Sequence, residues 1–540
     1  MMRRRSRDDR VVVDLGTFGE GPAEVGAAWS DRDAFRDDEP DPEALARASA
    51  RRARRAVVVG LVVFLVLSAW GATTEVDGRH RAERLLTAPG GVLSLATAPS
   101  VAWSTATESA DGTAFMPGLV VVRRGTVLHG LDAGTGAERW QVEVGGDPRC
   151  GAYGEVIDPL VCWSGPNAAP QVTVVRRDGS FTTRALDAGV TWAAGTAGGG
   201  LATLRPIGPE PPADQVSVAD DGYTLRGSLG VGQDVEVTLV DAATGAVRWQ
   251  KTIPFHVVDD PWSCGTITPS PSGTQPSYTF TVPPPTLQVV RGLIEVDGCG
   301  VRAVFTPDGA PTAGGGKSAW WIAEPYVDGG VLEQVGGYQG AAAVASVLHR
   351  ADGSVAALYP TQVLNPWATD GTTTDLVLTG SAGVPLTALG PPGTVHWRST
   401  HSYGALLVRT ARVAVLTRSG GGIAAVDLRT GRELWAHLDL PAPDSTLPPL
   451  GAFTDGRFAA LAVGGNQKTK GGASTTDLVT LDLATGDIRW RTTLPDGGSS
   501  LVAAEGHLID TAQQDFASID DSRPGGAFVN HSPGTVSALG

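Results

Sequence analysis

The sequence lacks the residue constellations of the common catalytic sites. It contains no G-x-S-x-G, no H-E-x-x-H, no Walker-type G-x-x-x-x-G-K-[ST], and no G-x-G-x-x-G between a strand and a helix. The nearest approach to a cation site is His256 with Asp259 and Asp260, but Pro261 places these residues in an exposed turn. We therefore expect no catalytic, cofactor-binding or metal-binding residues.

Four cysteines offer two kinds of chemistry, zinc ligation or disulfide formation. They are Cys150, Cys162, Cys264 and Cys299, and no C-x-x-C or nearby histidine indicates a zinc site. Of the three possible pairings, the sequence favours the two local ones, Cys150 with Cys162 and Cys264 with Cys299, and we expect each bridge to pin a loop excursion. Such bridges require an oxidising compartment, so the topology of the chain matters.

A candidate membrane helix precedes all four cysteines. Residues 56–72, AVVVGLVVFLVLSAWGA, are the one long uncharged apolar run, and as a helix they reach about 25 Å, short but sufficient to cross a membrane. Arginines cluster at 51–55 and Thr73-Thr74-Glu75 follows, so the positive-inside rule places the N-terminus in the cytoplasm. The sequence predicts a single-pass protein of the cell membrane whose remaining residues are extracytoplasmic.

Two other interpretations of this run stay open. Ala69-Trp70-Gly71 loosely fits a signal-peptidase site, although the tract before the apolar run is far longer than the n-region of a signal peptide. The run could also be a buried core helix. In the favoured topology, residues 1–55 form a cytoplasmic tail with 12 Arg and 12 Asp+Glu. The tail has few core-forming residues, so we expect it to be largely disordered.

Internal similarity is the strongest signal in the chain. An Asp-x-x-Thr-Gly-x-x-x-Trp pattern occurs four times without a gap. Its members are Asp132, Thr135, Gly136 and Trp140; Asp241, Thr244, Gly245 and Trp249; Asp427, Thr430, Gly431 and Trp435; and Asp482, Thr485, Gly486 and Trp490. The spacing predicts a hairpin in which Asp accepts backbone N–H groups, Gly adopts a positive φ, and Trp is buried between two sheets.

Weaker copies of the pattern lie at 176–179, 305–309, 350–353 and 393–397. The eight copies are about 38 to 65 residues apart, the range of four-stranded propeller blades with loops of variable length. One residue in five is Gly or Pro, 71 and 37 of 540, which argues against an all-helical fold.

The repeat resembles the blade motif of the pyrroloquinoline-quinone (PQQ) type β-propellers over roughly residues 100–520. The resemblance implies an all-β propeller of about eight four-stranded blades, with seven or nine possible, in residues 100–540, after a linker and first strand region at 73–99. Pairing of strands near 500–503, 506–510 and 516–519 with a strand region at 92–103 would seal the ring.

The superfamily includes quinoprotein dehydrogenases and non-enzymatic scaffolds, such as the outer-membrane assembly lipoproteins, so the repeat predicts a fold and not a reaction. Quinoprotein alcohol dehydrogenases of this family typically carry two adjacent cysteines over the cofactor, and this chain has no Cys-Cys pair and no haem-attachment C-x-x-C-H. We expect a non-catalytic binding or scaffold module without a cofactor. A PQQ-dependent dehydrogenase is the alternative, which a funnel lined by Arg, Asp or Glu, Asn and Trp would favour.

The net charge and the predicted loops indicate what kind of partner the chain binds. With 42 Lys+Arg against 57 Asp+Glu the net charge is -15, which argues against nucleic-acid binding by a basic surface and favours a protein or cell-envelope component. Segments rich in Pro, Gly and Ser at 206–213, 261–285, 441–449 and 464–476 are predicted to be loops on the propeller faces, where binding sites usually lie.

Overall fold

The computed structural model divides the chain into two units, Met1–Glu75 and Val76–Gly540, and describes residues of the second unit only. The described residues are 78–107, 113–145, 148–151, 155–164, 170–212, 215–219, 224–270, 277–312, 321–335, 345–381, 383–391, 393–440, 451–468, 474–494, 501–512 and 534–539. The predicted cytoplasmic tail and membrane helix lie outside them. Within these ranges, no helix is long and apolar enough to cross a membrane.

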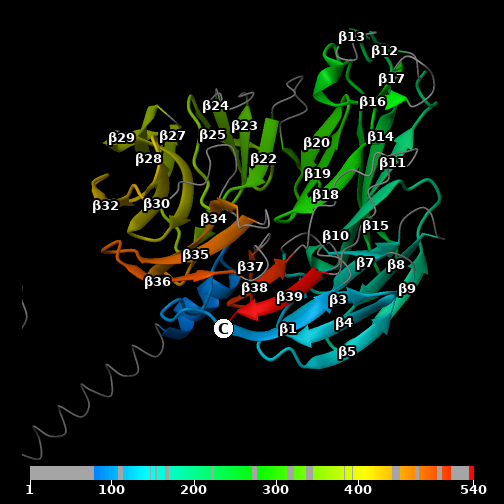
Figure 1. The fold of residues 1–540 in the computed structure, drawn as a ribbon. Helices are drawn as coiled ribbons and strands as arrows, with labels where there is room; N and C mark the ends of the chain where they lie inside the picture. The colour runs from blue at the N-terminus through cyan, green and yellow to red at the C-terminus, as the bar shows by residue number, and fades with distance from the viewer. Residues whose placement is uncertain are drawn as a thin grey trace, which may run out of the picture. The chain divides into compact units, whose positions relative to one another are not determined.

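Antiparallel sheets, here called blades, make up most of the second unit (Figure 1). Each of the first four has four strands. Blade 1 comprises β2 (Thr113–Met116), β3 (Leu119–Arg124), β4 (Val127–Asp132) and β5 (Glu138–Glu143); blade 2, β6 (Pro148–Cys150), β7 (Leu160–Ser164), β8 (Gln171–Val175) and β9 (Phe181–Ala185); blade 3, β10 (Trp192–Thr196), β11 (Gly200–Ile207), β14 (Asp234–Asp241) and β15 (Val247–Ile253); blade 4, β18 (Thr286–Val290), β19 (Leu293–Gly298), β20 (Val301–Phe305) and β21 (Pro311–Thr312).

The next four blades include one strand that is shared. Blade 5 comprises β22 (Trp321–Pro325), β23 (Val331–Val335), β24 (Ala345–His349) and β25 (Val355–Tyr359); blade 6, β27 (Val377–Ser381), β28 (Val384–Gly390) and the first half of β29 (Thr394–Arg409); blade 7, the second half of β29, β30 (Val413–Arg418), β31 (Ile423–Asp427) and β32 (Glu433–His437); blade 8, β33 (Gly451–Thr454), β34 (Phe458–Lys468), β35 (Ser474–Asp482) and β36 (Ile488–Thr493). The two-residue strand β26 (Ala368–Thr369) pairs in parallel with the end of β29.

Blade 9 joins the two ends of the unit. Its strand order is β37 (Leu501–Ala504), β38 (His507–Ala512), β39 (Gly534–Leu539) and β1 (Val101–Thr107), and β1 pairs with β39 from Val101–Leu539 to Thr107–Gly534. The predicted pairing of N-terminal and C-terminal strands is therefore present, but its third strand is β39. The expected strand at 516–519 lies outside the described residues.

The described residues thus contain nine blades when the halves of β29 are counted separately, which is the upper end of the predicted range. The segment at 73–99 differs from the prediction: residues 78–87 are helical, Gly91 and Val92 form only isolated bridges, and the first strand begins at Val101. Parts of the predicted loops are also strands, because β34 and β35 extend into 464–476, and β16 (Thr266–Ser270) and β17 (Ser277–Thr281) form a hairpin within 261–285.

The middle strands of the blades are buried on both faces. In β3 five consecutive residues are buried, and in β7 all five are, whereas β9 at the sheet edge is mostly exposed. A strand that has a neighbouring blade against each face cannot alternate apolar and polar side chains, so continuous apolar runs such as Leu119-Val120-Val121-Val122 are what this stacking requires.

A tryptophan on the last strand of a blade contacts the third-to-fourth-strand turn of the next blade. The indole Nε1 of Trp140 donates to Arg177 O at 3.1 Å, and a Cβ on Gly179 would lie 2.6 Å from Trp140 Cβ. Equivalent indole hydrogen bonds run from Trp103 to Ala133 O, Trp249 to Pro307 O, Trp397 to Leu428 O and Trp435 to Leu483 O. Because the turn residue is a glycine without a Cβ, the tryptophan ring can pack directly against the turn.

Two predictions about the repeat can now be compared with the structure. Positive φ is confirmed at Gly136, Gly245, Gly431 and Gly486, with values of 69°, 77°, 71° and 79°. Burial of the tryptophans is confirmed only for Trp140, which is 9% exposed. The prediction is wrong for Trp249, Trp435 and Trp490, which lie on the edge strands β15, β32 and β36 and are half-buried.

We expect Trp140→Ala to lower the free energy of unfolding by about 3 to 5 kcal/mol, because it removes a large buried side chain. Trp140→Phe keeps much of the packing and loses the indole hydrogen bond, a net contribution of about 1 kcal/mol. Denaturant titration followed by circular dichroism measures both. The exposed Trp262, at 48%, is the matched control, and a loss for Trp140→Ala no larger than for Trp262→Ala would contradict the inter-blade role.

Candidate functional site

The aspartates of the repeat serve their own turns. Asp132 Oδ1 accepts hydrogen bonds from the backbone N and hydroxyl of Thr135, at 3.0 and 2.9 Å, and Arg139 donates to Oδ2 at 2.7 Å. The Arg139 and Thr135 hydrogen bonds hold the pKa of Asp132 down at about 2. In this turn both carboxylate oxygens are engaged.

Both predicted disulfides are confirmed. Cys150 and Cys162 are directly paired residues of β6 and β7, so this bridge lies inside blade 2. Cys264 is bonded to Cys299, which lies in the turn between β19 and β20. Only the second bridge pins a loop excursion, and the expectation that each would do so is wrong for the first.

The Cys264–Cys299 bridge anchors a small satellite to blade 4. The satellite is built from residues 208–233, between β11 and β14, and 254–285, between β15 and β18. It contains the hairpin of β12 (Val216–Val218) and β13 (Leu225–Gly227), the hairpin of β16 and β17, and the 3-10 helix η3 (Pro261–Ser263). Its own core includes Val216, Leu229, Phe255, Val258 and Phe280.

Hydrogen bonds fix the satellite backbone where regular pairing ends. The Gln215 amide donates to Val231 O and accepts from Val231 N, both at 2.8 Å, and His256 N donates to Gly300 O at 2.8 Å. Asp260 Oδ1 accepts from Trp262 N at 3.3 Å and caps η3. The excursion is thereby a defined surface and not a set of independent loops.

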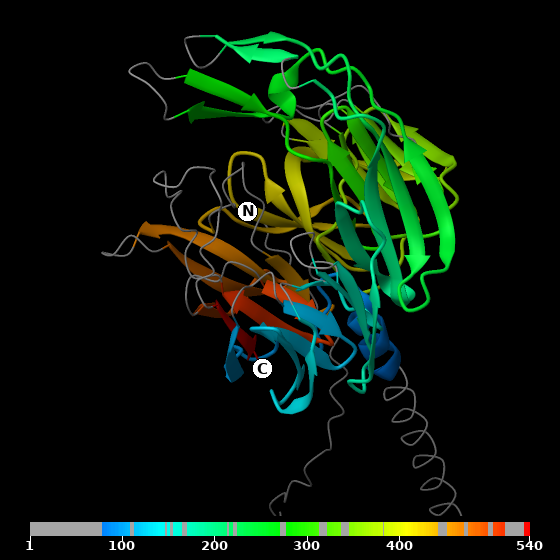
Figure 2. The same ribbon diagram turned by 90° about the vertical axis from the view of Figure 1, so that its right-hand side faces the viewer.

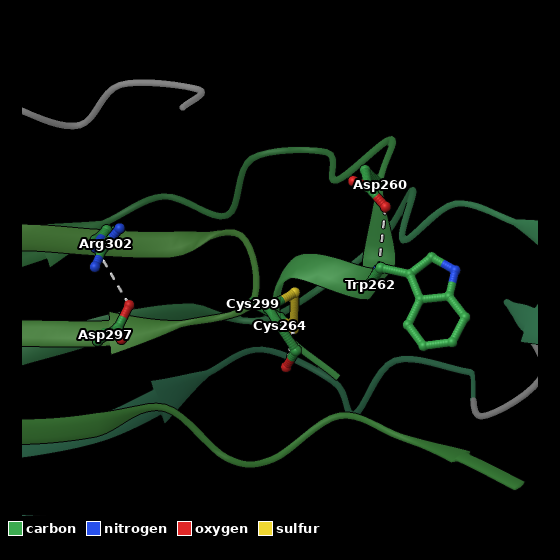
Figure 3. Close-up of a disulfide and its surroundings, with 6 residues drawn as sticks. All are labelled: Asp260, Trp262, Cys264, Asp297, Cys299 and Arg302. Atoms are coloured by element: carbon green, nitrogen blue, oxygen red, sulfur yellow. Dashed lines mark hydrogen bonds and ion pairs between the residues drawn. A yellow bond between two sulfur atoms is a disulfide. The ribbon is translucent and has the colours of Figure 1, made fainter. Parts of the chain in front are cut away.

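Large apolar side chains project from this surface. Trp262 is 48% exposed, and Val257 and Val231 are 58% and 59% exposed. Figure 3 shows the Trp262 ring directed away from the Cys264–Cys299 bridge that holds its turn in place. A tryptophan on a rigid turn loses little conformational entropy on binding, which is why tryptophan is common at the centres of protein interfaces.

Strand direction places the satellite on a defined end of the blades. Because successive strands are antiparallel, first-to-second and third-to-fourth turns share one end, the turn end, which carries the repeat motif. Second-to-third turns and connections between blades lie at the other, the connection end. Both satellite segments are of this second kind, and so is the turn that contains Cys299.

The N-terminal segment, in contrast, is docked at the turn end. Residues 90–96, here called the strap, follow helix 78–87, and Val92 N and Leu93 N donate to Thr454 O and Gly506 O, both at 3.0 Å. The buried Asp455 accepts Leu95 N at 3.0 Å through Oδ2, and its carbonyl accepts Arg81 Nε at 3.0 Å. In Figures 1 and 2 the helix (dark blue) and the satellite hairpins (green) lie far apart.

Polar residues converge near blades 2, 4 and 5. Glu155, between β6 and β7, accepts Gly292 N at 3.0 Å through Oε1, beside Arg291, whose φ is 47°. Burial raises the pKa of Glu155 and of Glu324 above the ordinary value, and the positive charge of Arg291 opposes both shifts. One arginine and two glutamates therefore influence one another here.

The cation candidate from the sequence does not assemble. His256, Asp259 and Asp260 are all described, and the described part of the chain holds no cluster of three or more His, Cys, Asp or Glu side chains suited to a metal ion. Asp260 is engaged in the η3 cap.

Sequence reasoning missed the satellite core and the strap contacts. The apolar residues Phe255, Val258 and Phe280 among the prolines of this region could have indicated a small core. The contacts that Asp455 makes with Arg81 and Leu95, in contrast, join residues more than 350 positions apart along the chain, and no local pattern predicts such a contact.

The chain matches the PQQ_2 family, described as outer membrane protein assembly factor BamB, over residues 89–277 and 365–518. The matched segments contain the strap, blades 1 to 3, most of the satellite, and blades 6 to 8. They make up more than half of the chain, and all four strong copies of the repeat lie within them.

Matching solved structures include BamB from Moraxella catarrhalis, at 12% identity, 82% of this chain, 99% of that chain and a TM-score of 0.36. The quinohemoprotein alcohol dehydrogenase from Comamonas testosteroni matches at 13% identity, 82% of this chain, 76% of that chain and a TM-score of 0.34. Apo AztD from Citrobacter koseri matches at 11% identity, 73% of this chain, 88% of that chain and a TM-score of 0.31. Matches this distant carry no argument about function. No curated protein matches the chain.

We expect the double variant Cys264→Ser, Cys299→Ser to loosen the satellite and leave the blades folded. In the chain-entropy model, a disulfide between residues 35 positions apart stabilises the folded state by about 4 kcal/mol. Hydrogen exchange measured by mass spectrometry should then rise in the satellite and stay unchanged in blades 1 and 8. The Cys150→Ser, Cys162→Ser variant is the control, because its bridge lies within blade 2. Unchanged exchange in the satellite would contradict the anchoring role.

Proposed function

We propose that this chain, which belongs to the PQQ_2 family of the outer membrane protein assembly factor BamB, is a non-catalytic, membrane-tethered binding module that acts outside the cytoplasm. Its partner is a protein or a protein-bearing component of the cell envelope. The observation that carries the proposal is the exposed Trp262 on a turn that the Cys264–Cys299 bridge fixes to blade 4.

The repeat itself favours binding over catalysis. In the first copy the Asp and Thr side chains are engaged in turn hydrogen bonds, the Trp side chain packs against the next blade, and a turn glycine leaves room for the ring. The family description names an assembly factor for membrane proteins, and such a factor works by contact. The satellite supplies what a contact surface needs: large apolar side chains on a backbone held by a disulfide and by side-chain hydrogen bonds.

The tether would hold this surface close to the membrane. The predicted membrane helix ends at residue 72, and the first described helix begins at residue 78. The five intervening residues reach at most about 18 Å when extended. In this proposal the second unit therefore stays near the membrane.

Charge narrows the class of partner. The predicted cytoplasmic tail is neutral, so the net charge of -15 belongs to the extracytoplasmic part. A partner with a basic or neutral surface is favoured, although long-range attraction fades beyond the Debye length of about 8 Å at physiological salt.

The topology is tested by adding protease to intact spheroplasts. We expect loss of the blades and protection of an N-terminal fragment that ends near residue 72, because the arginines at 51–55 hold the N-terminus inside. Permeabilised spheroplasts are the control. A mature chain that begins near Ala72 would show that residues 56–72 are a cleaved signal, and would remove the tether from the proposal.

The binding surface is tested with a photo-crosslinking residue at position 262 of the full chain in native membranes. Val247 is the matched control, because it is 60% exposed and begins β15 at the turn end of blade 3. We expect a specific protein adduct from position 262 and none from 247. With the purified partner, Trp262→Ala should weaken binding about 30-fold, as loss of an interface anchor worth about 2 kcal/mol does.

Equal adducts from positions 262 and 247, or unchanged affinity for Trp262→Ala, would contradict the satellite as the contact surface.

The quinoprotein alternative has a separate test, titration of the full chain with PQQ and a divalent metal in an assay of alcohol- or sugar-dependent dye reduction. Stoichiometric PQQ binding with substrate-dependent turnover would replace the binding module with a dehydrogenase.

A further inference from the structure

The strap and the last repeat turn enclose a cavity of about 270 Å³ at the turn end of blade 8. It is lined by Ala96, Arg457, Phe458, Asp482, Asp487, Ile488 and Arg489. The volume lies just below the usual 300 to 1,000 Å³ of small-molecule sites. Its walls carry two guanidinium groups and two carboxylates beside an aromatic and an aliphatic side chain.

Other copies of the repeat show what these residues ordinarily do. In blade 1, Arg139 is ion-paired with Asp132 at 2.7 Å, and in blade 3, Arg248 donates to Asp241 Oδ2 at 3.3 Å. In both, the motif threonine hydroxyl also donates to the aspartate, at 2.9 Å. Arginine and aspartate at these positions neutralise each other within one turn.

In blade 8 the corresponding arginine and aspartate are not paired. Arg489, at the position of Arg139, donates through Nε to Ala96 O of the strap at 3.3 Å, and the hydroxyl of Thr485 donates to Asp487 at 2.8 Å. Asp482 Oδ1 still accepts the backbone N–H groups of Ala484 and Thr485. Among the described residues, no protein group donates to Asp482 Oδ2.

Arg457 supplies the second cation. Its guanidinium lies 4.9 Å from the centroid of the Phe458 ring, and its side chain makes no ion pair with the described residues. The backbone around it is fixed, because Arg457 O accepts Leu483 N at 3.0 Å and Arg457 N donates to Asp455 Oδ1 at 2.8 Å. The cavity thus holds guanidinium donors and a carboxylate acceptor on a rigid frame.

We propose that this strap cavity binds a small zwitterion, a molecule with a phosphate or carboxylate group and a primary ammonium group a few bonds apart. Guanidinium N–H groups bind the anionic oxygens. Asp482 Oδ2 accepts a hydrogen bond from the ammonium group, and Phe458 and Ile488 contact the carbon atoms between the charges. Two cationic and two anionic side chains on the walls make an ion of one sign a poorer fit than a zwitterion.

This chemistry has two sources, a soluble metabolite and the headgroup of an amino-phospholipid. The second source rests on the proposed tether, which holds the chain at a membrane. The zwitterion itself rests on the cavity and does not depend on the satellite or its partner.

The test is calorimetric titration of the full chain in a non-ionic detergent with O-phosphoethanolamine. We expect saturable binding, weakened at least tenfold by Arg457→Gln and by Asp482→Asn. Phosphocholine is the matched ligand control, because its quaternary ammonium has no N–H to donate, and it should bind at least tenfold more weakly. Inorganic phosphate should also bind more weakly than O-phosphoethanolamine.

Arg139→Gln and Asp132→Asn are the matched protein controls, since they change the same repeat positions in a turn whose charges are already paired. Both should leave binding unchanged.

A second experiment, native mass spectrometry of the chain extracted from membranes, distinguishes the two sources of the ligand. One bound phosphatidylethanolamine that is lost in Arg457→Gln identifies the lipid, and soluble binding without co-purified lipid identifies the metabolite.

The proposal is overturned by four results: no saturable binding of O-phosphoethanolamine together with no co-purified amino-phospholipid, equal binding of phosphate, equal binding of phosphocholine, or equal weakening by the blade 1 controls. None of these results affects the satellite interface, which is read out at position 262.

Discussion

Most blades are linked to the next by a side chain that crosses from their last strand to the neighbouring turn. The indole bonds from Trp103, Trp140, Trp249, Trp397 and Trp435 all end on turn carbonyls of the following blade. In blade 2, Arg184 takes this part and donates to Ala242 O at 2.8 Å. The link requires a glycine in the accepting turn, because a Cβ there would meet the ring. One contact therefore explains why Gly and Trp are the most constant members of the repeat, and why the turn ends of neighbouring blades are aligned.

The same contact explains the strap. The last tryptophan, Trp490, has no following motif turn, because the third and fourth strands of blade 9 come from opposite ends of the unit and no turn joins β39 to β1. Its indole donates to Leu95 O at 2.8 Å instead. The strap therefore substitutes for a turn, and Asp455 holds it there. This substitution draws Arg489 away from Asp482, so the cavity is a direct consequence of joining the chain ends at this place.

What could be predicted from the sequence depended on how local the cause was. The glycine conformations, the hairpins and both disulfides follow from residues within 35 positions of each other, and these predictions were confirmed. The burial of Trp249, Trp435 and Trp490 was overestimated, because the pattern does not reveal that the motif strand is a sheet edge. The satellite, β39 and the contacts of Asp455 depend on pairings between segments far apart in the chain, for which a single sequence carries no periodic signal.

Repetition also separates structural residues from those available for function. In two copies the aspartate and the arginine form an ion pair, Asp132 with Arg139 and Asp241 with Arg248. There the ion pair within the turn is enough to explain why both charged residues are present. Where a copy keeps the residues but loses the contact, as Asp482 and Arg489 do, turn formation accounts for Oδ1 of Asp482, which still accepts two backbone N–H groups, but not for the second oxygen or for the arginine. The satellite represents another departure, added chain that no blade needs for its own pairing. Among the described residues, both departures from the repeat thus offer groups for binding, one at each end of the blades.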